Sequence, residues 1–372
     1  MLLLRGQTKL KSTCRNFSDW TSQNVRQTFL DFFSGAHHEI VPSSSVIPAK
    51  WRNKTPLPFV NAGMVQWRPI IMNETKLPRR FESGVVNAQK CIRVGGKACD
   101  LEEVGHDGHH LSFFEMLGNW SFNGSYNRET AIKLAWDLLT NEYKIPKERL
   151  FVTYFNGCNK LGLPADEETK ELWLANGVES QRILPFGADH NFWQMGLDGP
   201  CGPCTEIHFA HRDGIDLKNQ VNKSDEVVEL WNLVFMENCL DSSGKLSKLP
   251  SQHIDTGMGL ERLTAVLRGS KSNYDTDLFS PLFDAISQRT KFEPYSGSFN
   301  RYIMKDSNYF VTYLTVLGTK IHLIEYLRIT SECAQFVSVM ACIQTHLQKC
   351  VKFYAELFVC SVINFTWTLI LI

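Results

Sequence analysis

Three segments of the sequence carry polar residues where packing alone favours apolar ones. The first is CIRVGGK (91–97), in which Arg93 follows an apolar stretch and precedes two glycines and a lysine. Two cations and several backbone N–H groups can surround a polyphosphate, because both complement negatively charged oxygens. By itself the segment is better explained as an ordinary basic turn, and it lacks the GxxxxGK[ST] pattern of a P-loop.

The second segment places an amide inside an otherwise apolar strand. Asn232 lies in VVELWNLVFM (227–236), which we expect to be buried on both faces. An unsatisfied buried amide costs about 1–3 kcal/mol, so either a core hydrogen-bond network or a ligand must satisfy Asn232. The residues alone do not decide between these alternatives.

The third segment is DTGMGLERL (255–263). Its glycines allow the backbone to approach a ligand closely, and Arg262 lies one turn inside the helix that we expect to follow. The carboxylate of Asp255 suits an amino group better than a phosphate, because it is itself anionic. The alternative is that Asp255 only caps this helix.

The pattern of apolar and capping residues predicts the elements that position these segments. The predicted helices cover 21–35, 129–143 and 165–177; the predicted strands cover 84–93, 112–118 and 227–236; a short strand, a glycine turn and a helix are predicted over 251–267. Irregular loops, rather than regular βαβ units, connect them. This arrangement predicts an α+β fold with a mostly antiparallel sheet flanked by helices.

Taken together, the segments resemble the alanyl-tRNA synthetase family, whose members are class II aminoacyl-tRNA synthetases. Seven stretches match the family in order and spacing between about residue 20 and residue 297. They are NAGM (61–64), QKCIRVGGK (89–97), HHLSFFEMLGNW (109–120), NFWQM (191–195), GPCGPCTEI (199–207), ELWNLVFM (229–236) and DTGMGLER (255–262). Details of 154–177 are more similar to the mitochondrial branch of the family than to the cytosolic one.

The resemblance implies an ATP-dependent alanine–tRNA ligase that forms alanyl-adenylate and pyrophosphate. It implies two catalytic residues: Arg93 would grip the α-phosphate and the alanine carboxylate, and Arg262 would lie near the adenine or the distal phosphates. The implied ATP site consists of Arg93, His110, Trp193, Leu230, Trp231, Asn232 and Gly259. The implied alanine site consists of Met64, Asn232 and Asp255, with Asp255 facing the ammonium group. Mg²⁺ is expected with the nucleotide, where it neutralises charge.

One cysteine pair has the spacing of a metal or redox site. Cys201 and Cys204 form a CxxC pattern with His208 and His211 nearby. A site made of these four would crowd its ligands into eleven residues, and the resemblance implies that CGPC is pocket wall without metal. We expect no zinc, since the zinc-bearing editing domain of the family is absent from this sequence.

The composition of the N-terminal residues indicates a subcellular location. Residues 1–18 contain four basic residues and no acidic one, which is typical of a mitochondrial presequence, although a frayed basic arm is the alternative. We therefore expect the mitochondrial matrix, where cysteines stay free. Lys plus Arg and Asp plus Glu are both 39, so a nucleic acid would have to be met by a local basic patch.

We predict a catalytic domain over 19–297 and a divergent tail over 298–372. The tail contains one glycine and no proline, and it ends in the uncharged stretch LFVCSVINFTWTLILI (357–372). It is interpreted as an alternative 3′ end without selected function, as a helical segment packed on the core, or as a membrane anchor. Sixteen uncharged residues fall short of the roughly 20 that a spanning helix needs, so no stable membrane association is expected.

The expected partners are L-alanine, ATP and the acceptor end of tRNA(Ala), and we expect a monomer. KACD (97–100) stands where the family usually has KHND, and the family's tRNA-recognition domain is missing, which places transfer to tRNA in doubt. The alternative hypothesis is a catalytically incompetent product that binds a nucleotide or a partner without turnover.

Overall fold

The computed structural model describes residues 20–48, 59–94, 104, 107–196, 198–215, 217–221, 226–241 and 243–290. Three expectations concern residues outside these ranges: the presequence over 1–18, the KACD stretch (97–100) and the hydrophobic tail over 298–372. Within the described ranges, no helix has the length and apolar character needed to span a membrane.

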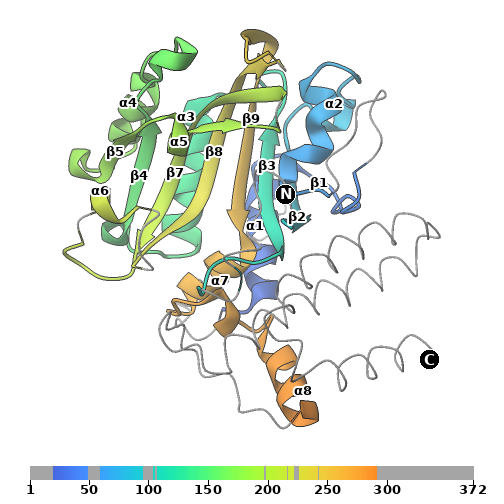
Figure 1. The fold of residues 1–372 in the computed structure, drawn as a ribbon, viewed down its shortest axis with the longest axis vertical. Helices are drawn as coiled ribbons and strands as arrows, with labels where there is room; N and C mark the ends of the chain where they lie inside the picture. The colour runs from blue at the N-terminus through green and yellow to red at the C-terminus, as the bar shows by residue number, and fades with distance from the viewer. Residues whose placement is uncertain are drawn as a thin grey trace, which may run out of the picture. The chain divides into compact units, whose positions relative to one another are not determined.

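The described residues are organised around a nine-stranded sheet (Figure 1). Its path runs β1-β2-β3-β9-β8-β7-β4-β5, and β6 pairs with β7 beside this path. The outermost pairs, β1–β2 and β4–β5, are parallel, and the other pairs are antiparallel. The strands are β1 (Glu39–Ile40), β2 (Val85–Ile92), β3 (Phe113–Ser121), β4 (Leu150–Phe155), β5 (Ile183–Phe186), β6 (Phe192–Gln194), β7 (Gly199–Ala210), β8 (Val227–Leu240) and β9 (Leu246–Gly259). The predicted α+β fold with a mostly antiparallel sheet is confirmed.

Three of the α-helices begin where a short polar side chain caps them. Thr21, Asn127 and Asp166 each accept a hydrogen bond from a backbone N–H in the first turn of α1, α3 and α4. The helices are α1 (Ser22–Gly35), α2 (Arg68–Ile71), α3 (Arg128–Asp137), α4 (Glu167–Ala175), α5 (Ala188–Asn191), α6 (Leu217–Gln220), α7 (Leu260–Leu267) and α8 (Ser280–Thr290). The three predicted helices are confirmed, except that the one over 129–143 continues beyond Asp137 as a π-helical turn.

The segment around Asp255 differs from the prediction over 251–267. No glycine turn separates strand and helix, because β9 runs directly into α7 and Gly259 occupies the N-cap position. Gly257 lies within the strand, where a Cβ would approach the sulfur of Met116 to 2.8 Å. Asp255 pairs inside the sheet, so the alternative that it caps the helix is wrong.

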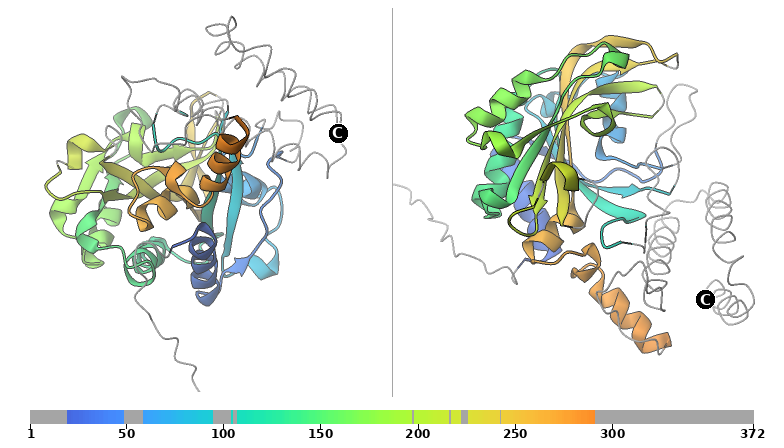
Figure 2. Two further views of the ribbon diagram at one scale, coloured as in Figure 1. Left: turned by 90° about the horizontal axis from the view of Figure 1, so that it is seen from below. Right: turned by 60° about the vertical axis from the view of Figure 1, so that its left-hand side comes forward.

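Helices cover one face of the sheet, as the right-hand view of Figure 2 shows for α1, α3 and α4. The core beneath them includes Val25, Phe29, Phe33, Ile132, Trp136, Trp173, Trp231, Leu233, Phe235 and Leu263. Because side chains alternate along a strand, the neighbouring positions of β8, Asn232, Val234 and Met236, point to the opposite face. That opposite face carries the candidate site.

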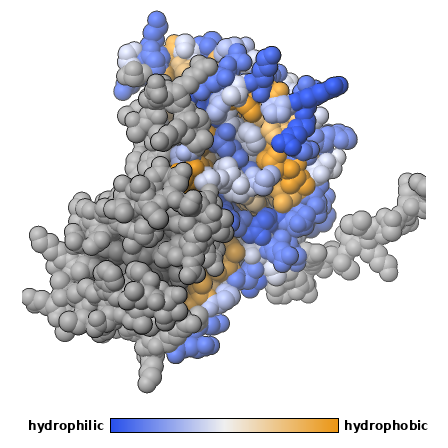
Figure 3. Space-filling model, turned by 90° about the vertical axis from the view of Figure 1, so that its right-hand side faces the viewer, coloured by the Kyte–Doolittle hydropathy of each residue, from blue (hydrophilic) through white to orange (hydrophobic). Residues whose placement is uncertain are grey.

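The opposite face has its own apolar cluster, which includes Met64, Trp67, Trp120, Met195 and Val234. Met64 and Trp67 come from a 3-10 helix, η2 (Gly63–Trp67), which packs on β3 and β9. Seen from the side of α2 and β1, the described surface is mostly hydrophilic, with separate apolar patches (Figure 3). The polar residues of the site are therefore set among buried apolar side chains.

Candidate active site

A row of directly opposed residues crosses the centre of the sheet on the face away from the helices. Thr153 on β4 is opposite Glu206 on β7, Glu206 is opposite Asn232 on β8, and Asn232 is opposite Gly257 on β9. Residues directly opposite one another in an antiparallel pair project to the same face. The sheet thus brings a carboxylate, an amide and a glycine into one line.

In the neighbouring row, Asp255 on β9 is the direct partner of Trp120 on β3. The indole N–H of Trp120 donates to Asp255 Oδ1 at 2.5 Å. The Trp120 ring is fully buried, and glycines make room for it: a Cβ on Gly118 or Gly63 would lie 2.3 or 2.8 Å from its atoms. Trp120 therefore fixes the orientation of the Asp255 carboxylate.

The charge of Asp255 has no counterpart in the described residues. Its side chain is buried, and no cation is found to act on it there. Burial raises the pKa of Asp255 to about 7, although the hydrogen bond from Trp120 lowers it. A buried charge without a partner is costly, and a ligand that brings a positive charge removes that cost. An ammonium group satisfies this requirement.

Asn232 lacks one hydrogen bond in the same way. Its Nδ2 lies 3.4 Å from Glu206 Oε1, whereas its Oδ1 is buried and has no hydrogen-bond partner among the described residues. Burial raises the pKa of Glu206 to about 7, and His190, Thr153 and Arg262 lower it. Asn232 therefore presents an acceptor that a ligand with N–H or O–H groups can satisfy.

The two predicted catalytic arginines flank these rows. Arg93 lies just beyond β2, where its Nε donates to the carbonyl oxygen of Asn61 at 3.1 Å and its guanidinium lies 5.0 Å from the Phe114 ring centre. Arg262, in the first turn of α7, donates from Nη1 to the carbonyl oxygen of Glu229 at 2.7 Å. Burial and Glu206 raise the pKa of Glu229, whereas Arg262, His208 and Arg93 lower it. Both arginines thus act on one carboxylate, and their guanidinium groups suit phosphate oxygens.

His110, Trp193 and Gly259 lie around the ends of the strands. Nδ1 of His110 is 2.6 Å from Asp107 Oδ2; burial raises the pKa of Asp107, but hydrogen bonds from His110 bring it down to about 2. Trp193 is half-buried on β6, opposite Gly202 of β7, and packs against the apolar clusters of the site face. Gly259 precedes α7 as its N-cap.

The remaining predicted residues are buried. Met64 is fully buried in the apolar cluster of the site face, together with Trp120. Leu230 and Trp231 belong instead to the core under the helices, and the Trp231 ring lies 5.8 Å from that of Phe29 on α1. The structure brings Met64 to the site face and turns the side chains of Leu230 and Trp231 away from it.

The CxxC pattern lies inside β7. Cys201 and Cys204 are buried, and a register shift separates them. Between them, a Cβ on Gly202 would lie 1.8 Å from the carbonyl oxygen of Phe235, so a close approach of β7 and β8 requires glycine there. The Nε2 of His208 is 3.0 Å from Glu206 Oε2. Within the described ranges, no cluster of three or more His, Cys, Asp or Glu residues is arranged to hold a metal.

Sequence reasoning missed two residues of the site, Trp120 and Glu206. Both lie in stretches that matched the family, but neither was given a role. Trp120 acts through its N–H on a carboxylate 135 positions away, which no local pattern indicates. Glu206 offered a weak signal, since a carboxylate within a strand that is otherwise buried must have hydrogen-bond donors.

Comparison with known proteins defines the class to which this fold and site belong. The family described as tRNA synthetases class II (A) matches residues 24–313. The chain therefore belongs to the class II tRNA synthetase family.

Within this family, the chain is similar to mitochondrial alanine–tRNA ligases. The chain is 53% identical to the mitochondrial alanine–tRNA ligase of Mus musculus over 277 residues. This aligned stretch covers 73% of this chain and 27% of that protein. It is 49% identical to the mitochondrial alanine–tRNA ligase of Saccharomyces cerevisiae over 299 residues, and this aligned stretch covers 80% of this chain and 30% of the yeast protein. The chain thus spans less than a third of the length of these two relatives. Among solved structures, the pyrrolysyl-tRNA synthetase of Desulfitobacterium hafniense is weakly similar, with a TM-score of 0.36 and 9% identity over 69% of this chain and 72% of that one.

Proposed function

We propose that this chain activates L-alanine with ATP and transfers the alanyl group to the acceptor end of tRNA(Ala). The observation that carries the proposal is the buried carboxylate of Asp255, oriented by Trp120 and lacking a cation among the described residues. The matched part of the chain is about half identical to alanine–tRNA ligases, so we propose that the ammonium group of alanine supplies the positive charge that Asp255 lacks.

In the proposed first reaction, a carboxylate oxygen of alanine attacks the α-phosphorus of ATP. A new P–O bond forms, the bond to the β-phosphate oxygen breaks, and pyrophosphate leaves. Asp255 and the Oδ1 of Asn232 hold the ammonium group. Arg93 neutralises the α-phosphate and the alanine carboxylate, and Arg262 binds near the adenine or the distal phosphates. Catalysis then consists mainly of positioning and charge neutralisation.

Mg²⁺ is the metal that such a reaction uses, and it neutralises the phosphates when bound. Sites for this ion usually take one or two carboxylates together with substrate phosphates, rather than a protein cage. Glu229 fits this pattern, because its side chain is 31% exposed and its carboxylate lies 3.8 Å from Arg262, an expected phosphate ligand. Glu229 would therefore hold the ion with the nucleotide.

In the proposed second reaction, a ribose hydroxyl of the terminal adenosine of tRNA attacks the alanyl carbonyl, and AMP leaves. We propose 19–297 as the catalytic domain, a monomer as the working form and the mitochondrial matrix as the location. The mitochondrial names of the similar proteins support the location.

Alanine-dependent exchange between ATP and labelled pyrophosphate tests the activation step on the full chain. We expect exchange with alanine that exceeds exchange with glycine or serine. Asp255→Asn should lower kcat/KM for alanine by about 10²-fold or more, because a buried charge pair loses one partner. The matched control is Asp213→Asn, whose carboxylate is 80% exposed and should leave the rate unchanged.

A soluble, folded chain that shows no exchange would contradict the proposed activation step. Charging of tRNA(Ala), measured separately with labelled alanine, tests the transfer step. Exchange without charging would restrict the function of this chain to activation.

A further inference from the structure

We propose that Glu206 is a positioning residue, which turns the amide of Asn232 so that its oxygen faces the ammonium group of alanine. This inference rests on the proposed alanine site and adds a residue that contacts Asn232 directly. Glu206 is 5% exposed and lies between Thr153 and Asn232 in the sheet.

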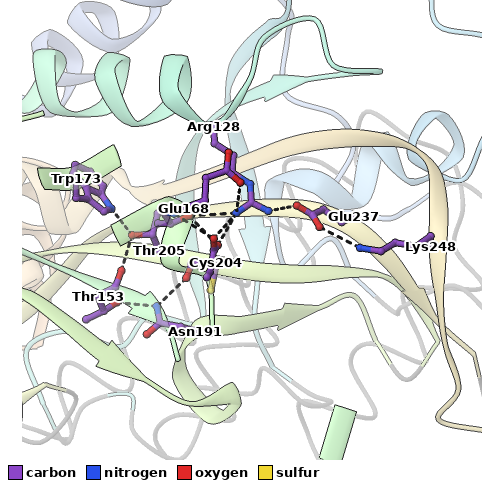
Figure 4. Close-up of polar contacts among 11 residues, drawn as sticks. Arg128, Thr153, Glu168, Trp173, Asn191, Cys204, Thr205, Glu237 and Lys248 are labelled. Atoms are coloured by element: carbon purple, nitrogen blue, oxygen red, sulfur yellow. Dashed lines mark hydrogen bonds and ion pairs between the residues drawn. The ribbon is translucent and has the colours of Figure 1, made fainter. Parts of the chain in front are cut away.

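Each polar neighbour of Glu206 can donate a hydrogen bond to it, His208 in the tautomer that carries its proton on Nε2. The Oε2 of Glu206 lies 3.4 Å from Thr153 Oγ1 and 3.0 Å from His208 Nε2, and its Oε1 lies 3.4 Å from Asn232 Nδ2. The direction of the first bond is fixed by its neighbour. Asn191 Nδ2 donates to Thr153 Oγ1 at 2.8 Å (Figure 4), so the hydroxyl proton of Thr153 is left for Glu206.

The acceptor character of Glu206 determines the orientation of Asn232. Above about pH 7 the Glu206 carboxylate is ionised and cannot donate, so only the NH₂ end of the amide can turn toward it. The amide oxygen therefore points elsewhere, and this is the atom that is buried without a partner among the described residues. Directly opposite Asn232 on β9 stands Gly257, and the absence of a side chain there makes room for the sulfur of Met116.

The orientation matters because of the charge of the ligand. With the oxygen outward, Asn232 and the neighbouring Asp255 both offer acceptors, and an ammonium group has three N–H donors to satisfy them. With the amide reversed, Asn232 would present its own N–H groups to a cation. Glu206 thereby makes the proposed site selective for a head group that donates hydrogen bonds.

A role in stability alone explains Glu206 poorly. A buried carboxylate is expensive, and replacing buried charges by neutral groups of similar shape is often neutral or stabilising. Burial raises the pKa of Glu206 to about 7 even though Arg262 lowers it. The carboxylate is therefore retained at a cost that its effect on Asn232 explains.

Glu206→Gln tests the orienting role, because glutamine has the same shape but can present either an oxygen or an NH₂ group to Asn232. In pyrophosphate exchange at pH 8, we expect the KM for alanine to rise about tenfold or more, as expected for a compromised hydrogen bond to a charged group. The kcat and the KM for ATP should change less than about twofold. Glu179→Gln, at an exposed glutamate, is the matched control.

A double-mutant cycle makes the test specific. If Glu206 acts through Asn232, adding Glu206→Gln to Asn232→Ala should not raise the KM for alanine further. An unchanged KM in Glu206→Gln, a parallel change in kcat and the KM for ATP, or an undiminished effect in the Asn232→Ala background would each overturn the proposal. Absence of exchange in the wild-type chain would instead overturn the proposed function on which it rests.

Discussion

A partly buried cluster around Arg128 and the buried polar residues of the candidate site differ in how their charges are neutralised. In the first, Arg128 at the start of α3 donates from Nη1 to both oxygens of Asp166 at 2.7 Å, and from Nη2 to Glu237. Its guanidinium lies 4.5 Å from the Phe235 ring centre, and Lys248 extends the cluster to Glu237 (Figure 4). Every charge in this cluster has a partner of opposite sign.

The second group consists of Asp255, Glu206 and Asn232. Burial raises the pKa of both carboxylates to about 7, and neither forms an ion pair with Lys or Arg among the described residues. The chain thus pairs the partly buried charges around Arg128 with charges of opposite sign, but provides no Lys or Arg partner for the two carboxylates here. Exceptions to full pairing are expected where a ligand completes the site.

Removing the cation of the first group should have the largest effect on stability. Arg128→Met keeps an apolar stem but leaves the partly buried Asp166 and Glu237 without their partner. We expect the free energy of unfolding to fall by about 3–5 kcal/mol, measured by guanidinium denaturation. Arg212→Met, at a side chain that is 65% exposed, should change it by less than about 0.5 kcal/mol. A loss below about 1 kcal/mol for Arg128→Met would show that this cluster is not tightly coupled.

Neutralising Asp255 in the second group should instead stabilise the fold. The pKa of Asp255 is about 7 in the fold against an ordinary value of 3.8, so the folded state binds the proton more tightly. The wild type therefore loses stability from this group as the pH rises between these values, and the loss is complete above pH 7. Asp255→Asn should raise the free energy of unfolding by about 1–3 kcal/mol at pH 8, with a smaller gain at pH 5.

The same unfolding experiment can reject this contrast. If Asp255→Asn destabilises the chain at pH 8 as strongly as Arg128→Met, then Asp255 is part of a satisfied structural cluster. The control is Asp213→Asn, an exposed carboxylate whose removal should give the same small effect at both pH values.

Much of the fold follows from local sequence signals. The helices predicted over 21–35 and 165–177 begin within two residues of α1 and α4, and the apolar stretch of β8 predicted a buried central strand. The glycines of β9 were misleading, because Gly257 suggested a turn. In the fold it serves close packing against Met116, which depends on a strand far away in the sequence.

The site was predictable only where its residues gave a local sequence signal. Asp255 and Asn232 were identified as polar residues within apolar stretches, and the sheet brings them into neighbouring rows. Trp231 lies in the same stretch, but strand alternation turns its ring into the core. Glu206 was missed, because its relation to Asn232 depends on strand register, and the sequence alone does not fix register.

The KM for alanine as a function of pH should show the smallest effect, and the one most specific to Asp255. Below about pH 7, Asp255 takes up a proton and can no longer attract the ammonium group. At saturating Mg–ATP, we expect the KM for alanine to rise up to about tenfold per pH unit below 7, since one pKa unit corresponds to about 1.4 kcal/mol. Glu206→Gln removes the second carboxylate of this group with a similar pKa, and a dependence that is lost in Asp255→Asn but kept in Glu206→Gln belongs to Asp255.

Arg128 and its carboxylates supply the matched control for this pH profile. A conservative change at the edge of that cluster, Lys248→Met at a side chain that is 73% exposed, should leave the profile unaltered. A KM for alanine that stays constant between pH 5.5 and pH 8 in the wild type, both limits being about 1–1.5 units from the expected pKa, would mean that Asp255 is already neutral or already paired. In either case the charge of the site would not come from this residue, and the difference between the two groups would need another explanation.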